Sequence, residues 1–156
     1  MNNTLMLIKK KKKRKMKKII LFLTIAYVSI TAIAQKPSVN YAHLINAIGT
    51  VESRMTDNVV NGPHAGFLQI SKVCVEDCNR INKIKKVPKR YTLQDRFNRQ
   101  KSIEMFWIVQ NFYNPTLDID YMILMWNEGN SAMKKPKRKT SYYKKVMAVY
   151  KNKESI

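Results

Sequence analysis

The first 34 residues set the strongest limit on the fold, because their pattern removes them from any folded domain. Residues 9–18 read KKKKKRKMKK, and the next 16 residues, IILFLTIAYVSITAIA, carry no charge. A basic stretch, an apolar stretch and the A-x-A sequence at residues 32–34 together describe a secretory signal peptide. The sequence therefore predicts a signal peptide over residues 1–34, cleaved after Ala34, and one domain over residues 35–156.

Two alternatives to this signal peptide stay open. A run of 16 apolar residues is short for a membrane span, which takes ~20 residues, so an uncleaved membrane anchor is the weaker interpretation. Translation from Met16 instead of Met1 would give a cleaner signal peptide, MKKIILFL. With either start we expect an exported protein, periplasmic or extracellular.

The domain that remains is strongly basic. The chain holds 30 Lys and Arg and 10 Asp and Glu, a net charge of +20. Nine of the basic residues and none of the acidic ones lie in residues 1–34, which leaves 21 basic against 10 acidic residues, or +11. Outside the cytoplasm such a charge attracts a protein to anionic envelope surfaces. We expect that attraction, and a Lys-rich coding bias with no partner is the alternative.

The same charge makes a nucleic-acid-binding protein a rival interpretation. Much of the charge belongs to the signal peptide, and the aromatic residues do not alternate with Lys and Arg as a stacking platform requires. We therefore expect no nucleic-acid partner. The chain also lacks G-x-S-x-G, HExxH and P-loop patterns, which argues against the commonest hydrolase, metalloprotease and nucleotidase classes.

Apolar residues at helical spacing predict a mostly α-helical domain with little or no β-structure. The predicted helices cover residues 40–55, 72–83, 93–113 (one or two helices), 117–126 and 141–152. Ser71 and Thr140 are predicted N-caps for two of them. Residues 56–66 and the basic stretch 133–139 are predicted loops, and residues 67–70 a short extended piece.

Two cysteines, Cys74 and Cys78, lie four residues apart on one predicted helix. An exported protein can form a disulfide, and at this spacing the Cα atoms lie ~6 Å apart, near the upper edge of disulfide geometry. The closed loop would be very short, so the bond would stabilise the fold little. A disulfide and two reduced, partly buried thiols both stay open, and no metal site is expected because no His or further Cys lies nearby.

Four short segments carry the functional prediction. They are Val51-Glu52-Ser53, Gly62 followed by GFLQI at 66–70, WNEG at 126–129, and Tyr142-Tyr143 with Val146. Their order and spacing resemble the soluble lytic transglycosylase family of the lysozyme-like superfamily, which has an E-S pair, a G-L-M-Q-I-like segment, an A-Y-N-x-G-like segment and a late Y-V-x-x-V helix. The resemblance covers residues 40–150. It implies a small lysozyme-like helical domain with an active-site cleft.

Glu52 is the candidate catalytic acid. It follows Val51 and lies one turn after Ile48, so its side chain borders the apolar face of its helix. A carboxyl group held against apolar groups favours its neutral form, which raises its pKa. A raised pKa suits a general acid that protonates a glycosidic oxygen near neutral pH. The resemblance assigns the catalytic acid to this residue.

The resemblance places the other site residues along a glycan cleft. Gln69 offers a donor and an acceptor to sugar groups, and a glycine beside it lets backbone approach a ligand closely. Trp126 stands where the family has Tyr, and Asn127 resembles the family's cleft Asn. The phenol beside the acid is assigned to Tyr142, with Tyr143 as the alternative. The expected substrate-contacting residues are Ser53, Gly66, Phe67, Gln69, Trp126, Asn127, Tyr142 and Tyr143.

The expected reaction follows from the resemblance and from the positions of the acidic residues in the sequence. Most glycosidases use two carboxylates, but no acidic residue in 56–130 is clearly placed as a partner of Glu52. The resemblance implies a single-acid lytic transglycosylase that cleaves the MurNAc–GlcNAc β-1,4 bond of peptidoglycan into 1,6-anhydro products without a metal or organic cofactor. We expect the protein to be a monomer. The alternatives are a hydrolytic muramidase and a non-catalytic protein that binds peptidoglycan glycan strands.

Overall fold

The computed structural model describes residues 39–152, and the predicted signal peptide, residues 1–34, lies outside this range. The described residues confirm a mostly α-helical domain with little β-structure. Their α-helices are α2 (Tyr41–Ser53), α3 (Lys72–Ile84), α4 (Arg99–Tyr113), α5 (Ile119–Glu128) and α6 (Ser141–Asn152). Two 3-10 helices, η1 (Leu93–Phe97) and η2 (Asn130–Lys134), precede α4 and follow α5.

A small antiparallel sheet follows α2. Its strands lie in the order β1 (Val60–Asn61), β2 (His64–Ala65) and β3 (Ile70–Ser71). Ala65 pairs with Val60 on one side and with Ile70 on the other. The predicted extended piece over 67–70 is wrong except at its last residue, because residues 66–69 form a turn in which Gln69 has a φ of +50°.

Side-chain caps decide where the helices begin. The predicted caps Ser71 and Thr140 both accept the N–H three residues further on, each at 3.1 Å. Asn98 ends η1 and caps α4, so of the one or two helices predicted over 93–113 the structure has two. Asp118 caps α5 in the same way, so this helix begins two residues later than predicted.

The end of α2 positions Glu52. Arg54 and Met55 both adopt left-handed backbone, with φ of 53° and 66°. The Arg54 N–H donates to the Thr50 carbonyl and the Met55 N–H donates to the Gly49 carbonyl, which closes the last turn. The helix therefore ends at Ser53, earlier than the periodicity predicts, and Glu52 lies in its final turn.

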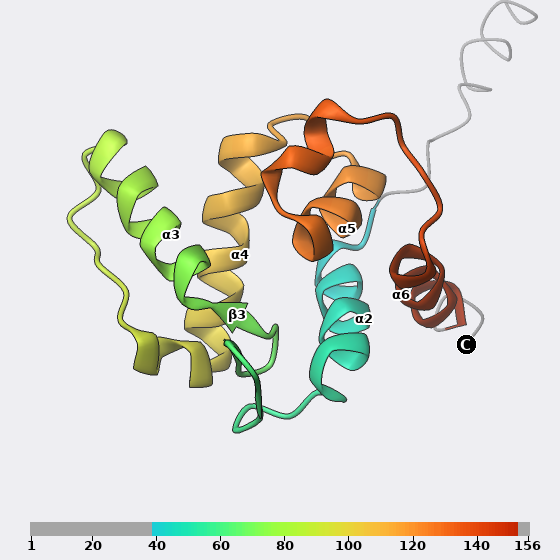
Figure 1. Cartoon of the computed structure of the whole chain (residues 1–156), viewed down its shortest axis with the longest axis horizontal. Coiled ribbons are helices and arrows are strands. Elements are labelled where there is room, and N and C mark those ends of the chain that lie inside the picture. The colour runs from blue at the N-terminus through green and yellow to red at the C-terminus, as the bar shows by residue number, and fades with distance from the viewer. Residues whose placement is uncertain (1–38, 153–156) are drawn as a thin grey trace, which may run out of the picture. The chain divides into compact units, whose positions relative to one another are not determined.

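The core lies where the helices meet the 66–70 turn. In Figure 1, α3 and α6 lie on opposite sides, with α4, α5 and α2 between them. Burial of each large apolar side chain contributes roughly 1.5–3 kcal/mol, which is what holds such short helices together. The largest fully buried side chains are Phe67, Phe106, Leu44, Ile48, Leu68, Ile70, Ile81, Met105, Met122, Ile123, Leu124 and Gln110. Within residues 39–152, no helix has both the length and the apolar character that a membrane span needs.

The two cysteines of α3 are free thiols. Cys78 is buried, and its Sγ donates to the backbone oxygen of Met105 in α4 at 3.5 Å. Cys74 is half-buried and lines the cleft described below. Of the two states that the sequence leaves open, the structure has the reduced one.

Candidate active site

Three hydrogen bonds join the four predicted segments, although these segments lie far apart in the sequence. The bonds run from Tyr142 Oη to Glu52 Oε1 (2.6 Å), from Ser53 Oγ to the Phe67 oxygen (2.8 Å) and from Trp126 Nε1 to the Leu68 oxygen (3.1 Å). The last turns of α2 and α5 therefore attach to successive carbonyls of the 66–70 turn, and the first turn of α6 attaches to α2.

Glu52 is half-buried, and its carboxyl group has a raised pKa. Burial raises this pKa because the charged form loses its hydration, and the hydrogen bond from Tyr142 lowers it by a smaller amount. Burial and the adjacent carboxylate also raise the pKa of the Tyr142 phenol, so this group stays a proton donor. The pair thus holds a carboxyl group whose neutral form is favoured in a fixed orientation.

Glu52 differs from the other carboxylates of residues 39–152 because it forms no ion pair with a described residue. Lys101 and Lys89 hold the pKa values of Asp95 and Glu104 below their usual range. A carboxylate fixed in its charged form beside a cation is a poor proton donor. The ion-paired carboxylates are Asp57, Glu76, Asp77, Asp95, Glu104, Asp118, Asp120 and Glu128.

A cleft of about 550 Å³ lies beside the 66–70 turn. Three of the predicted substrate residues, Gln69, Trp126 and Asn127, line it, together with side chains from β2, α3 and α4. Glu52 and Tyr142 are not among its lining residues. The backbone of residues 67–69 and its bond from Ser53 connect the Glu52 end of α2 to this cleft wall.

Gln69 presents one unused polar atom. Its Nε2 donates to the oxygens of Gly66 at 2.9 Å and Val59 at 3.4 Å. Because only the amide nitrogen can donate, these two bonds fix the orientation of the side-chain amide. Its Oε1 is buried without a hydrogen-bond partner among the described residues. An unpaired buried acceptor costs about 1–3 kcal/mol. Of the predicted donor and acceptor, the donor is therefore occupied, and the acceptor is unpaired but buried.

The α5 residues offer two different surfaces to the cleft. Trp126 is half-buried, with its ring centroid 4.9 Å from that of Phe106. Its single N–H already donates to the Leu68 carbonyl, so only its ring face is open to a ligand. Asn127 is exposed, and its side chain makes no hydrogen bond with the described part of the chain.

Three residues that we predicted to contact substrate instead hold the turn in place. The Phe67 side chain is completely buried against Gly49, where an added Cβ would lie 1.9 Å from the Phe67 ring. Gly66 has a φ of +80°, and a Cβ there would lie 1.8 Å from the Arg96 oxygen. Protein backbone therefore fills the space where a Cβ of this residue would lie. Ser53 Oγ is likewise occupied by the Phe67 and Gly49 carbonyls.

The structure separates the two adjacent tyrosines. Tyr143 Oη donates to Asp120 Oδ1 at 2.7 Å, beside a second cavity of about 120 Å³ that residues 137–139 help to line. Tyr142 is the one that contacts Glu52. Of the two assignments left open by the sequence, the structure therefore selects Tyr142 as the phenol beside the acid and places Tyr143 elsewhere.

Two arginines that the sequence analysis did not single out hold the segment after Glu52. Arg99 donates to the Met55 oxygen at 2.6 Å, pairs with Asp57 at 3.0 Å and lies over the Phe67 ring at 4.3 Å. Arg96 donates to the Pro63 oxygen just before β2 and to the Ile70 oxygen in β3, each at 3.2 Å. In such a basic chain, the spacing of these two arginines does not distinguish them from the solvent-exposed basic residues.

Comparison of the chain with protein-family models, with curated proteins and with solved structures gives no match in any of the three. Among residues 39–152, no three His, Cys, Asp or Glu side chains gather where they could hold a metal ion. The residues that surround Glu52 and the cleft therefore define what this site can do chemically.

Proposed function

We propose that this protein is an exported lytic transglycosylase that cleaves the MurNAc–GlcNAc bond of peptidoglycan, with Glu52 as its single acid and base. The observation that carries the proposal is the environment of Glu52. Its pKa is raised by burial, Tyr142 donates to it, and it has no ion-pair partner among the described residues. Such a carboxyl group can hold its proton near neutral pH and give it to a glycosidic oxygen.

The proposed reaction uses the two oxygens of Glu52 differently. Tyr142 donates to Oε1, so the acidic proton belongs on Oε2, which has no hydrogen-bond partner in the described part of the chain. Oε2–H protonates O4 of the leaving GlcNAc as the bond from C1 of MurNAc to O4 breaks. The carboxylate then takes the proton of the C6 hydroxyl group, whose oxygen bonds to C1. Closure of this 1,6-anhydro ring consumes no water and returns the proton to Glu52.

The cleft supports a glycan strand as the ligand. Its volume of about 550 Å³ is typical of ligand sites, which range over about 300–1,000 Å³. The Trp126 ring face suits stacking on a sugar, and the exposed amide of Asn127 suits the N-acetyl group.

Mass analysis of the products tests the reaction type. Purified peptidoglycan is digested with the protein, and the soluble muropeptides are separated and weighed. We expect anhydro-muramyl ends, which are lighter than reducing ends by one water. Reducing ends would identify a hydrolytic muramidase, with a second catalytic group. Binding to sacculi without any soluble product would identify a non-catalytic peptidoglycan-binding protein.

Removal of the Tyr142 hydroxyl group should move the pH profile to higher pH. The phenol stabilises the Glu52 carboxylate, so in Tyr142→Phe the pKa of Glu52 rises further. Because the acid must be protonated to act, the alkaline fall in kcat/KM shifts upward, while the less well oriented carboxyl lowers kcat by about tenfold to a hundredfold. The matched control is Tyr143→Phe, which removes a hydroxyl bonded to Asp120 and should leave this limb in place. A downward shift in Tyr142→Phe would contradict the assigned role.

A further inference from the structure

The last two residues of α3 and the connection that follows them expose an uncommon mixture of side chains. Residues 83–90 read KIKKVPKR, and every one of them is exposed. Two of them are large aliphatic residues: Ile84 is 56% exposed and Val87 is 43% exposed. The others include five basic residues: Lys83, Lys85, Lys86, Lys89 and Arg90. We call this segment the basic–apolar loop.

Most of the positive charge in the basic–apolar loop is uncompensated. Lys89 pairs with Glu104 at 2.5 Å. Within residues 39–152, the remaining four basic residues of the loop form no ion pair. Uncompensated cations therefore lie directly beside two exposed aliphatic side chains.

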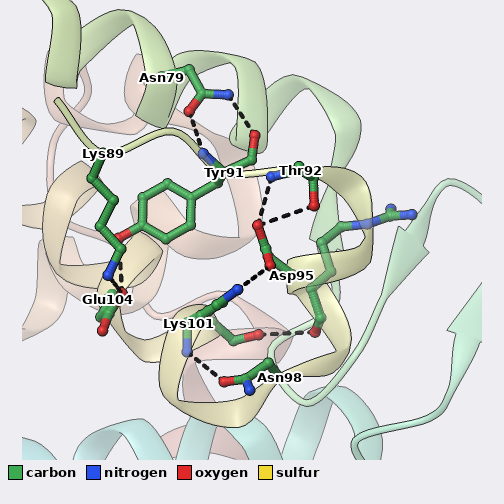
Figure 2. Close-up of polar contacts among 10 residues, drawn as sticks. Asn79, Lys89, Tyr91, Thr92, Asp95, Asn98, Lys101 and Glu104 are labelled. Atoms are coloured by element: carbon green, nitrogen blue, oxygen red, sulfur yellow. Dashed lines mark hydrogen bonds and ion pairs between the residues drawn. The ribbon is translucent and has the colours of Figure 1, made fainter.

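Two asparagine residues of α3 hold the backbone of the loop in place through hydrogen bonds. Figure 2 shows Asn79 of α3 bonded to both the N–H and the C=O of Tyr91, at 2.7 and 2.8 Å. Asn82 donates to the Lys89 oxygen at 2.9 Å and accepts the Val87 N–H at 2.9 Å. These bonds fix the loop before any partner arrives, so little conformational entropy is lost when it binds a surface.

Lys86, in the middle of the loop, has an unusual backbone conformation. Lys86 has a φ of +55°, a left-handed conformation that glycine adopts at much lower cost. The turn at this point is closed by a bond from the Lys86 N–H to the Lys83 oxygen. A lysine at a position that favours glycine is consistent with a role for its positive charge in binding a partner.

We propose that the basic–apolar loop docks the domain on an anionic phospholipid surface. Ile84 and Val87 enter the boundary between headgroups and acyl chains, and the flanking cations lie among the lipid phosphates. The exposed aliphatic pair favours a lipid surface over a soluble polyanion, because a polyanion would use the cations and gain nothing from Ile84 and Val87. In Figure 1 the connection lies on the far side of α3 from α2 and α6, so docking leaves Glu52 and Tyr142 away from the surface.

Vesicle binding by the full chain tests this proposal. Vesicles of phosphatidylcholine alone are compared with vesicles that also contain phosphatidylglycerol, by co-sedimentation. The basic block at residues 9–18 can also bind anionic vesicles, and it is present in all variants. Hydrogen exchange is therefore measured in the peptide that covers residues 83–90, because it reports contact at the basic–apolar loop alone. We expect binding to the anionic vesicles, with slower exchange in the basic–apolar loop.

Two variants separate the charge from the apolar contribution. K83S/K85S/K86S should weaken binding by roughly a hundredfold, because each basic residue beside an anionic surface contributes about fivefold. I84S/V87S keeps the charge and should weaken binding by about tenfold. The matched controls are K144S/K145S/K151S, which removes three exposed lysines of α6, and V60S, which removes an exposed valine of β1. Both controls should bind within a few-fold of the wild type.

Three results would overturn the proposal. The first is equal weakening by the loop triple variant and the α6 triple variant, which would mean that only net charge matters. The second is wild-type affinity in I84S/V87S. The third is binding that soluble inorganic polyphosphate removes equally from the wild type and I84S/V87S, which would identify a general polyanion site. The vesicle measurement requires no glycan cleavage, so it stands apart from the proposed enzymatic function.

Discussion

Glu52→Gln should abolish the release of soluble muropeptides from purified peptidoglycan. Glutamine keeps the shape of the side chain and can still accept the bond from Tyr142, but its amide has no acidic proton to give. A positioned general acid or base contributes about 10²–10⁴-fold to a rate. Because Glu52 serves as both acid and base in the proposed reaction, we expect the loss to reach or exceed the upper end of that range. The measurement is the initial rate at which labelled sacculi dissolve.

The same substitution should leave the fold intact and stabilise it at neutral pH. Burial raises the pKa of Glu52 above its value in the unfolded chain, so protonation favours the folded state. That contribution is fully present below the unfolded pKa and is lost as the pH rises through the folded pKa. Glutamine does not ionise, so Glu52→Gln should have the higher Tm at neutral pH, with a difference that shrinks toward about pH 4. Calorimetry of both proteins across this range checks the sign.

Glu128→Gln is the matched control for the activity measurement. Glu128 is half-buried at the end of α5 and pairs with Arg138 and Lys135. Loss of a surface ion pair changes stability by about 0–1 kcal/mol, and we expect near wild-type rates. Full activity in Glu52→Gln, or an equal loss in both variants, would refute the assignment of Glu52 as the acid.

Gly66→Ala should be the most destabilising of the conservative changes considered for this chain. Gly66 has a φ of +80°, and an added Cβ would lie 1.8 Å from the Arg96 backbone oxygen. That oxygen already accepts a bond from Ser102 Oγ at 2.9 Å, so it cannot move away freely. Left-handed backbone costs an alanine roughly 1–2 kcal/mol and overpacking about 1–3 kcal/mol. We expect a loss of roughly 2–5 kcal/mol, measured as the free energy of unfolding in urea.

Gly62→Ala isolates the backbone part of this effect. Gly62 has a φ of +57°, but no atom lies within 4 Å of the position that its Cβ would take. The variant therefore carries the left-handed strain without the clash, and its loss should be about 1–2 kcal/mol. Equal losses in Gly62→Ala and Gly66→Ala would show that the contact with Arg96 does not matter. Gly66→Ala should also reduce activity, because the turn places Gln69 in the cleft wall.

The helical architecture could be predicted because it depends on local signals. Apolar spacing located all five described helices, and the caps Ser71 and Thr140 are where the sequence predicts them. The helix boundaries were less accurate where backbone conformation decided them. Arg54 and Met55 adopt left-handed angles that nothing in their residue types favours, and Asn98 acts as an end and a cap at once.

The candidate site was only partly predictable, because residue type does not reveal which partner a side chain meets. Gly66 and Phe67 were predicted to face a ligand, yet they meet Arg96 and Gly49. These contacts depend on how α4 and η1 pack against the turn, and the periodicity of one helix contains no information on that packing. For the same reason Arg99 could not be told from a solvent-exposed cation.

By itself, the sequence predicted a basic, mostly helical domain over residues 35–156, and it singled out Glu52 through its order relative to Gln69, Asn127 and Tyr142. Tertiary structure alone decided the state of that residue. It brought Tyr142 of α6 to 2.6 Å from its carboxyl group, and it gave every other carboxylate of the described residues a basic partner. A pKa depends on burial and on neighbouring charges, and both are properties of the packed chain.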